Sequence, residues 1–254
     1  MDKNQLFHFL ESNYLKYNRF EFIENDPIQI PHRFNQKEDI EIAAFLSASI
    51  AWGQRPIVIR NANRLMELME YAPADFVRNC TDKDLINFES FKHRTFQSID
   101  IQFFIKSLQN IYLNHGGMEN VFSEGFKIDA QSALIEFNDL FYQTSHQKRT
   151  EKHLSNPAKN SATKRLNMFL RWMIRHDKSG VDFGLWKSIS PAQLMLPLDV
   201  HTARIGRGIG LLTRKQNDWH AVEEITAALR LFDPYDPVKY DFALFGFGVN
   251  EKNE

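Results

Sequence analysis

Apolar residues recur at helical spacing along almost the whole of this chain of 254 residues. The spacing i, i+3, i+4 aligns one apolar stripe on a helix, which can then be buried against its neighbours. Seven segments show this spacing, at 38–49, 56–71, 99–115, 131–144, 161–176, 199–212 and 218–232. No pair of strands emerges from the remaining residues. The pattern predicts an all-α protein.

The organisation of the chain indicates a single globular unit over residues 1–254, built of two helical lobes. Its 43% apolar residues, 22 phenylalanines among them, can form a substantial core. The charged and periodic N-terminus predicts a first helix instead of a signal peptide, and no apolar run approaches the length of a membrane span. The single cysteine, Cys80, fits a reducing compartment. We therefore expect a soluble, cytoplasmic protein.

The net charge of −1 conceals a strong asymmetry along the chain. Residues 148–215 carry 14 lysines and arginines against four carboxylates, a balance of +10, whereas the rest of the chain has 17 basic and 28 acidic groups. A one-sided charge of this size can focus an electric field toward an anion such as a phosphate backbone. The alternative is that the two blocks neutralise each other in the folded protein. The asymmetry makes DNA a candidate partner.

A carboxylate stands at the expected start of a basic helix in the stretch 197–212. Pro197 and Leu198 favour an extended approach, and Asp199 can accept hydrogen bonds from the free amides of the first helical turn. Arg204 and Arg207 then place cations on the same helix. A simple helix cap is one interpretation. The other is a carboxylate that stabilises a developing sugar cation, beside cations that bind the flanking phosphates.

Residues 198–202, Leu-Asp-Val-His-Thr, resemble the catalytic string of the helix-hairpin-helix DNA glycosylases, the endonuclease III superfamily. Residues 41–69 resemble the early helix pair of that fold, and residues 239–249 resemble its last helix. The whole chain also resembles a family of uncharacterised bacterial proteins within that superfamily. The resemblance implies two helical lobes, at 37–180 and at 1–36 plus 181–254. It also implies that Asp199 is catalytic, lies in the cleft between the lobes and serves excision of a damaged base from duplex DNA.

Two features of that superfamily are missing from the sequence. The phosphate-binding hairpin should stand shortly before Asp199, but within residues 179–196 only Gly180-Val181 is weakly similar to it. An iron-sulfur cluster needs four thiolates, and the chain has Cys80 alone. We expect the fold without a recognisable hairpin, without an iron-sulfur cluster and without any other cofactor.

The segment 161–176 predicts a helix with an apolar stripe and a cationic stripe. Lys164, Arg171 and Arg175 fall on the side opposite to Leu166 and Met173. This string is similar to the lysine helix of the archaeal 8-oxoguanine glycosylases, which precedes the catalytic aspartate by a few tens of residues. Here Lys164 stands 35 residues before Asp199. The similarity implies that Lys164 is the attacking amine, although a solvated helix face would show the same stripe.

The implied chemistry assigns roles to several further residues. Cleavage of an N-glycosidic bond creates an oxocarbenium-like sugar that Asp199 would stabilise, and the amine of Lys164 could attack C1′ and add AP-lyase activity. The base must be flipped out of the duplex and received in a pocket. The arginines expected to contact DNA are Arg165, Arg171, Arg175, Arg204 and Arg207. The residues expected to form the base pocket are Trp52, Gln54, Arg55, Asp241 and Phe245.

Two other classes of function stay open from the sequence. His153, the pair His176-Asp177 and Asp199 follow the order found in helical metal-dependent phosphohydrolases, although His176 also suits the C-terminal end of a helix. We expect no metal site. The missing hairpin favours the second alternative, a DNA-binding protein that keeps the fold without catalysis.

Overall fold

The computed structural model describes residues 1–250. Helices make up 64% of the structure and strands 2%, so the predicted all-α class is confirmed. The chain divides into two compact units, of which unit 1 is Met1–Phe22 with Asn156–Glu254 and unit 2 is Ile23–Ser155. The lobes expected from the sequence have boundaries at residues 36 and 180 instead. No described helix combines the length and the apolar character needed to cross a bilayer.

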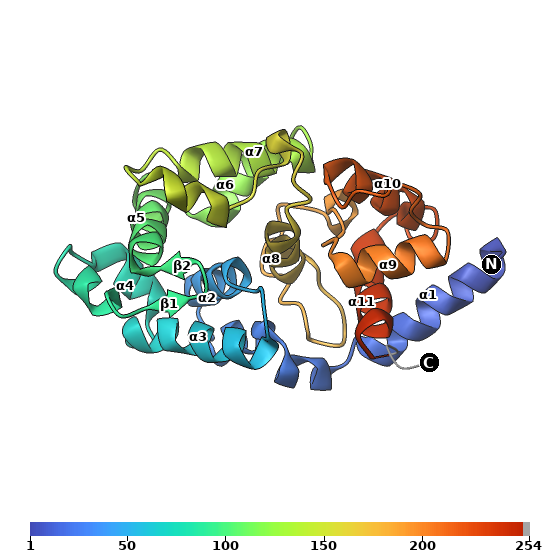
Figure 1. The fold of residues 1–254 in the computed structure, drawn as a ribbon, viewed down its shortest axis with the longest axis horizontal. Coiled ribbons are helices and arrows are strands. Elements are labelled where there is room, and N and C mark those ends of the chain that lie inside the picture. Colours follow the sequence, from blue (N-terminus) through green and yellow to red (C-terminus); the bar gives the residue numbers. More distant parts are fainter. Residues whose placement is uncertain (251–254) are drawn as a thin grey trace. The chain divides into compact units, whose positions relative to one another are not determined.

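Unit 2 consists of helices and one short hairpin (Figure 1). Its elements are α2 (Lys37–Ser49), α3 (Arg55–Leu68), α4 (Pro73–Asn79), β1 (Lys92–His93), β2 (Phe96–Gln97), α5 (Ser98–Asn114), α6 (Met118–Gly125) and α7 (Ala130–Phe141). The two strands are antiparallel, with Lys92 opposite Gln97. The sequence did not predict this hairpin, because strands of two residues are too short to show an alternating pattern.

Aromatic rings fill the core of unit 2. The rings of Phe122 and Phe137 stack with their centroids 4.3 Å apart, and the Phe137 ring meets that of Phe45 edge-on at 5.7 Å. Phe104 joins this cluster from α5, with its centroid 6.0 Å from that of Phe45. All four side chains are buried. Removal of these rings from water is the main favourable term that holds α2, α5, α6 and α7 together.

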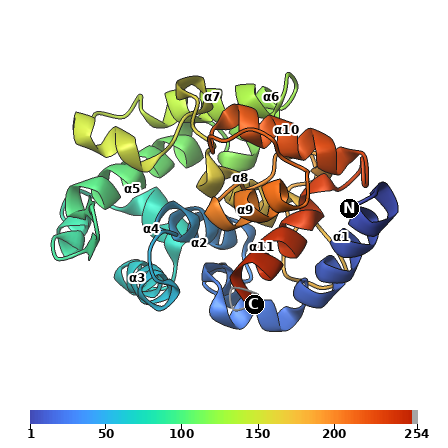
Figure 2. The same cartoon turned by 45° about the vertical axis from the view of Figure 1, so that its right-hand side comes forward.

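Unit 1 brings the first helix of the chain against the last one. Its α-helices are α1 (Lys3–Tyr17), α8 (Lys164–Ile174), α9 (Val200–Gly208), α10 (Trp219–Arg230) and α11 (Tyr240–Asn250). In both views α1 lies alongside α11, and α9 also packs on α11 (Figure 1, Figure 2). Gly246 permits the approach of α1, because a Cβ at this position would collide with the Tyr17 ring. Gly248 faces α9, where an added Cβ would lie 3.3 Å from the Cβ of His201.

The seven helices predicted from the spacing of apolar residues all form. α2 and α5 begin and end within one residue of the expected limits, whereas α8 is shorter than expected at both ends. Ser190 and Gln193 form a capping box at the start of a 3-10 turn over Pro191–Gln193. Between α8 and this turn the described backbone forms only turns, bends and irregular segments.

Candidate active site

Asp199 is the N-cap of α9, as the sequence predicted. Its extended backbone directs Oδ1 toward the first turn, where the backbone amides of His201 and Thr202 donate hydrogen bonds of 2.8 and 2.9 Å. The side chain is half-buried. Within residues 1–250 no group donates a hydrogen bond to its other oxygen, Oδ2. The helix therefore holds the carboxylate by one oxygen and leaves the second for another partner.

Lys164 is the first residue of α8 and is half-buried. Its Nζ lies 3.3 Å from Sδ of Met168, one turn further along the helix. No carboxylate of the described chain comes within ion-pair distance of this ammonium group. The preceding residue, Thr163, has left-handed backbone angles of φ 43° and ψ 37°, which are unusual for a β-branched residue. A strained, buried turn thus presents Lys164 at the start of α8.

Asp241, on the first turn of α11, is the residue whose pKa is affected by the other charged groups of the site. It is 6% exposed, its Oδ2 accepts a hydrogen bond from Nη1 of Arg171, and its Oδ1 is buried without a partner. Burial raises the pKa of its carboxyl to about 6, and the negative charge of Asp199 also acts to raise it, whereas the positive charges of Arg171 and Lys164 act to lower it. The first turns of α8, α9 and α11 therefore place Lys164, Asp199 and Asp241 within electrostatic reach of one another.

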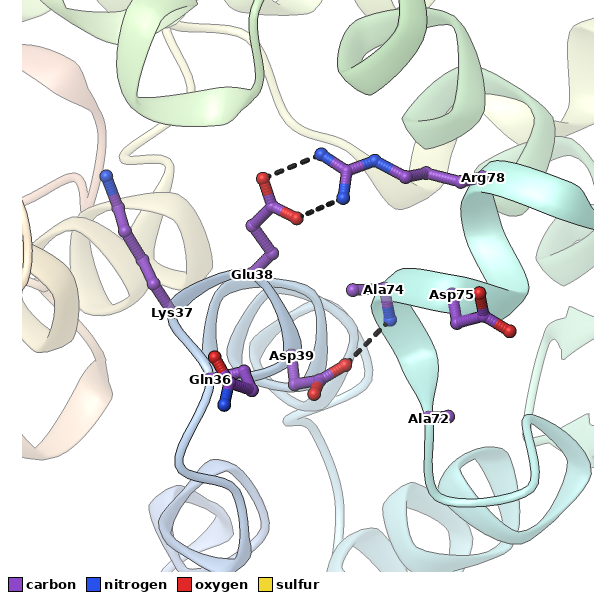
Figure 3. Close-up of a pocket in the computed structure, with 8 residues that line it drawn as sticks. All are labelled: Gln36, Lys37, Glu38, Asp39, Ala72, Ala74, Asp75 and Arg78. Carbon is purple, nitrogen blue, oxygen red and sulfur yellow. Dashed lines mark hydrogen bonds and ion pairs between the residues drawn. The ribbon is translucent and has the colours of Figure 1, made fainter.

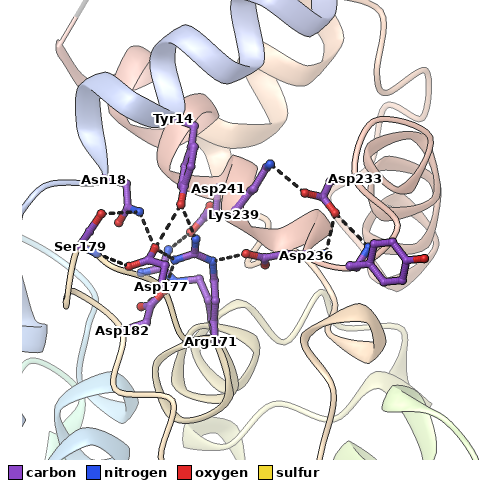
Figure 4. Close-up of polar contacts among 12 residues, drawn as sticks. Tyr14, Asn18, Arg171, Asp177, Ser179, Asp182, Asp233, Asp236, Lys239 and Asp241 are labelled. Carbon is purple, nitrogen blue, oxygen red and sulfur yellow. Dashed lines mark hydrogen bonds and ion pairs between the residues drawn. The ribbon is translucent and has the colours of Figure 1, made fainter.

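A buried network of ion pairs supports this site next to α11 (Figure 4). Nε of Arg171 lies 3.3 Å from Oδ1 of Asp182, and Nη1 of Arg175 lies 3.0 Å from Oδ2 of the same residue. Arg175 also contacts Asp236 at 2.9 Å and Asp177 at 2.6 Å. Asp177 also accepts hydrogen bonds from the Tyr14 hydroxyl and the Asn18 side-chain amide at the end of α1, and from the backbone amide of Ser179 in the loop after α8 (Figure 4).

The network corrects one expectation from the sequence. The cationic stripe predicts that Arg171 and Arg175 are exposed and contact DNA, but they are 3% and 0% exposed and fully engaged with carboxylates. The predicted helical period of α8 is right, and its polar side faces Asp182, Asp236 and other acids instead of solvent. The stripe itself gave no signal of these acidic partners, because it looks the same in the sequence whether water or protein faces it.

The other arginines expected to contact DNA also have structural partners. Arg204 donates a hydrogen bond of 2.9 Å to the carbonyl of Gly248 near the end of α11. Arg207 donates to the carbonyls of Arg214 and Lys215, at 2.8 and 2.9 Å, and so orders the loop after α9. Arg165 is half-buried on the first turn of α8. A role of any of these three residues in DNA contact stays a prediction.

The five residues expected to form a base pocket are distributed over both units. Asp241 and Phe245 lie one turn apart on α11 in unit 1, and the centroid of the Phe245 ring is 6.3 Å from that of His201 on α9. Trp52, Gln54 and Arg55 lie at the start of α3 in unit 2. There the indole of Trp52 meets the buried His93 ring edge-on, with centroids 4.8 Å apart. The role of these residues in binding a base stays a prediction.

A pocket of about 440 Å³ opens at the first turn of α2 in unit 2 (Figure 3). The guanidinium of Arg78 pairs with both oxygens of Glu38, and Asp39 accepts a hydrogen bond of 2.9 Å from the amide of Ala74. These contacts join α2 to α4. No residue that the sequence singled out lines this pocket, and its charges serve the packing of the two helices.

Two of the residues that the sequence suggested for a metal site, Asp177 and His153, are engaged in other contacts. Asp177 pairs with Arg175. His153 lies buried in unit 2, with Nε2 3.3 Å from Oδ2 of Asp100. Within residues 1–250 no three His, Cys, Asp or Glu side chains form a group that could hold a metal ion.

The fold and the site define an all-α protein in which Lys164, the helix-capping Asp199 and the buried Asp241 stand at the starts of three helices, within electrostatic reach of one another. The chain belongs to the family described as protein of unknown function (DUF2400), which matches residues 26–250. No curated protein and no solved structure matches the chain. All residues of the candidate site lie within the segment that the family covers.

Proposed function

We propose that the protein is a base-excision DNA glycosylase in which Asp199 stabilises the cationic sugar and Lys164 supplies an attacking amine. One observation carries the proposal. Lys164 and Asp199, which are 35 residues apart in the sequence, both act on the pKa of Asp241, and neither is neutralised by an ion pair within the described chain.

The geometry at Asp199 suits the stabilisation of a positive charge. Two backbone amides hold Oδ1, so the carboxylate is oriented before the reaction and Oδ2 can face the electron-poor sugar. Electrostatic stabilisation by such a fixed group needs little reorganisation during bond cleavage. The amine of Lys164 can then form the new bond to C1′ and give a Schiff base, which permits strand cleavage by elimination.

Duplex DNA with a damaged base is the proposed substrate, with the base flipped out of the stack. Since Arg171 and Arg175 are buried in ion pairs, phosphate contacts fall to other cations of unit 1, such as the exposed Lys215 in the loop after α9. Each phosphate contact would release condensed counterions, so affinity should fall steeply as salt rises.

Borohydride trapping on duplexes that carry a panel of oxidised, deaminated and alkylated bases tests the proposal. Native protein should release a base and give a covalent DNA adduct. Lys164→Gln should abolish the adduct, because only an imine with that amine can be reduced and captured. Lys178→Gln is the matched control, since this lysine is exposed in the same unit, and it should trap like the native protein.

The variant Asp199→Asn separates catalysis from folding. Asparagine caps a helix about as well as aspartate, so fold and most DNA affinity should be kept while base release is lost. Trapping that persists without Lys164 would assign the amine to another lysine and overturn its role. Salt-dependent DNA binding without base release from any lesion would favour a binding protein that keeps the fold without catalysis.

A further inference from the structure

We propose that Asp241 is the proton-holding carboxyl of this site, with Oδ1 as the atom that takes up and returns the proton. The inference rests on the proposed function of Lys164 and Asp199 and adds a third catalytic group to it. It starts from the unequal environments of the two Asp241 oxygens.

The two oxygens of Asp241 have different surroundings: one is held by a hydrogen bond and the other has no partner. Oδ2 is fixed by the guanidinium of Arg171, which is itself held by Asp182 and lies over the Phe242 ring with Cζ 4.3 Å from the centroid. Oδ1 is buried, yet it has no hydrogen-bond partner. A buried oxygen without a donor is costly unless a proton or a ligand reaches it. Oδ1 is therefore the position where a proton can be added without breaking any contact.

Asp182 shows what a purely structural carboxylate looks like in the same network. It is as deeply buried as Asp241, at 2% exposure. Its Oδ1 faces Nε of Arg171 and its Oδ2 accepts from Nη1 of Arg175, so both oxygens are used. Protonation of Asp182 would break an ion pair. Asp182 therefore serves as an internal comparison for Asp241, since both of its oxygens are paired within the same network.

The charges around Asp241 come from α8, α9 and the loop after α8. Burial raises the pKa of Asp241 to about 6, Asp199 and Asp182 act to raise it, and Arg171 and Lys164 act to lower it. A carboxyl poised near neutral pH exchanges protons more effectively than an ordinary aspartate, because the best catalytic acids and bases have a pKa close to the working pH. The balance depends on Lys164, so loss of the lysine charge favours protonation of Asp241.

The proton balance of the reaction follows. The ammonium of Lys164 gives one proton to Oδ1 of Asp241, which leaves a neutral amine and a carboxylic acid. The amine lone pair forms the bond to C1′ while the bond from C1′ to the base nitrogen breaks and its electron pair leaves with the base. Asp241 then gives its proton to that nitrogen. The products are a neutral free base, a sugar-linked ammonium on Lys164 and a carboxylate on Asp241, so atoms and charge balance.

Titration of the full-length protein with ¹³C-labelled aspartate carboxyls tests the inference without reference to activity. The resonance that disappears in Asp241→Asn identifies Asp241, and its midpoint should lie at about pH 6. Lys164→Gln should move this midpoint upward, because a positive charge is lost, and Asp199→Asn should move it downward. Lys178→Gln should leave it unchanged. These variants keep the Arg171 network intact, so they do not depend on the stability of Asp241→Asn.

The pH profile of trapping is the second readout. In native protein the single-turnover rate should have an acid limb near pH 6 that is absent in Asp241→Asn. Asp182→Asn perturbs the same arginine and should keep an acid limb, moved to lower pH because a negative charge near Asp241 is lost. A midpoint of Asp241 below pH 4.5, no response to Lys164→Gln, or an unchanged limb in Asp241→Asn would each overturn the inference. A midpoint near 6 that responds to Lys164, in a protein that traps no DNA, would uphold the proton-holding carboxyl and overturn the glycosylase.

Discussion

The two units of the protein have interiors of opposite chemistry. In unit 2 the centre is made of phenylalanine rings, with the Phe137 ring in contact with those of both Phe122 and Phe45. In unit 1 the centre holds two buried arginines, Arg171 and Arg175, among four aspartates. Burial of rings stabilises a fold without fixing directions. Buried ion pairs contribute little net stability, because desolvation of the charges offsets much of their attraction, but they orient each group.

The difference shows which unit fixes the orientation of its buried groups. Unit 1 carries the candidate active site, and its charged interior fixes Asp241 through Arg171 and leaves one oxygen unused. An aromatic interior could hold α11 in place but could not orient a carboxyl or shift its pKa by opposing charges. The following predictions test this contrast, and they begin with the largest effect.

Arg175→Met should destabilise the protein strongly, with the largest loss among these variants. It leaves the buried Asp182 and the half-buried Asp177 and Asp236 without their common partner, and loss of one side of a buried ion pair costs about 4 kcal/mol. Urea denaturation at pH 8 measures the loss. At pH 5 the loss should be smaller, because burial raises the pKa of Asp236 and its protonation removes part of the unpaired charge. Equal losses at both values of pH would contradict the role of the aspartates.

Asp241 should make native stability depend on pH in mildly acidic solution. The pKa of its carboxyl is about 6 in the folded protein and 3.8 in the unfolded reference, so the folded state binds more protons between these values. Stability from this group is therefore greatest below about pH 4 and falls as pH rises to 6, by on the order of 3 kcal/mol. The native curve minus the Asp241→Asn curve, measured from pH 4 to 7, isolates the effect. Parallel curves would rule it out.

Phe137→Leu should be tolerated in unit 2. The substitution keeps an apolar side chain among Phe122 and Phe45, so the loss should be about 1.5 kcal/mol. No titratable group is replaced, so the loss should be the same at pH 5 and pH 8. Denaturation under the conditions used for Arg175→Met gives a direct comparison. A pH-dependent loss would contradict the contrast between the two interiors.

Arg204→Gln should have the smallest effect. It removes the hydrogen bond to the Gly248 carbonyl and a cation from the C-terminal end of α11, which together contribute about 1 kcal/mol. Arg64→Gln is the matched control, because its pair with Glu67 is exposed and should contribute close to nothing. Thermal denaturation compares the two variants. If they have equal melting temperatures, Arg204 has no capping role, and its side chain becomes a better candidate for contact with DNA.

The helices and the cap of Asp199 could be predicted because their signals are local. The spacing of apolar residues indicated α2 and α5 to within one residue, and an aspartate after an extended Pro-Leu approach indicated the start of α9. These features depend on residues within one or two turns. The hairpin of β1 and β2 was missed because its strands are too short to carry a pattern.

The surroundings of α8 could not be predicted, since they depend on contacts between residues far apart in the chain. The polar stripe of this helix was visible in the sequence, but a stripe does not say whether water or other protein faces it. Asp236, just before α11, and Asp241, on its first turn, are more than 60 residues away in the sequence and convert an apparent surface into an interior. The unpaired Oδ1 of Asp241 belongs to the same class of feature and had no signal in the sequence.

The close packing of α1 on α11 imposes an order on the folding of this protein during its synthesis. Unit 2 is continuous in sequence, so its residues leave the ribosome together and can fold as they emerge. Leu6 and Leu10 of α1 lack their packing partner until α11 is made. A chain interrupted before Tyr240 would lack Asp241 opposite Arg171 and would expose the apolar side of α1. The site around Asp241 is therefore assembled only once α11 has been made.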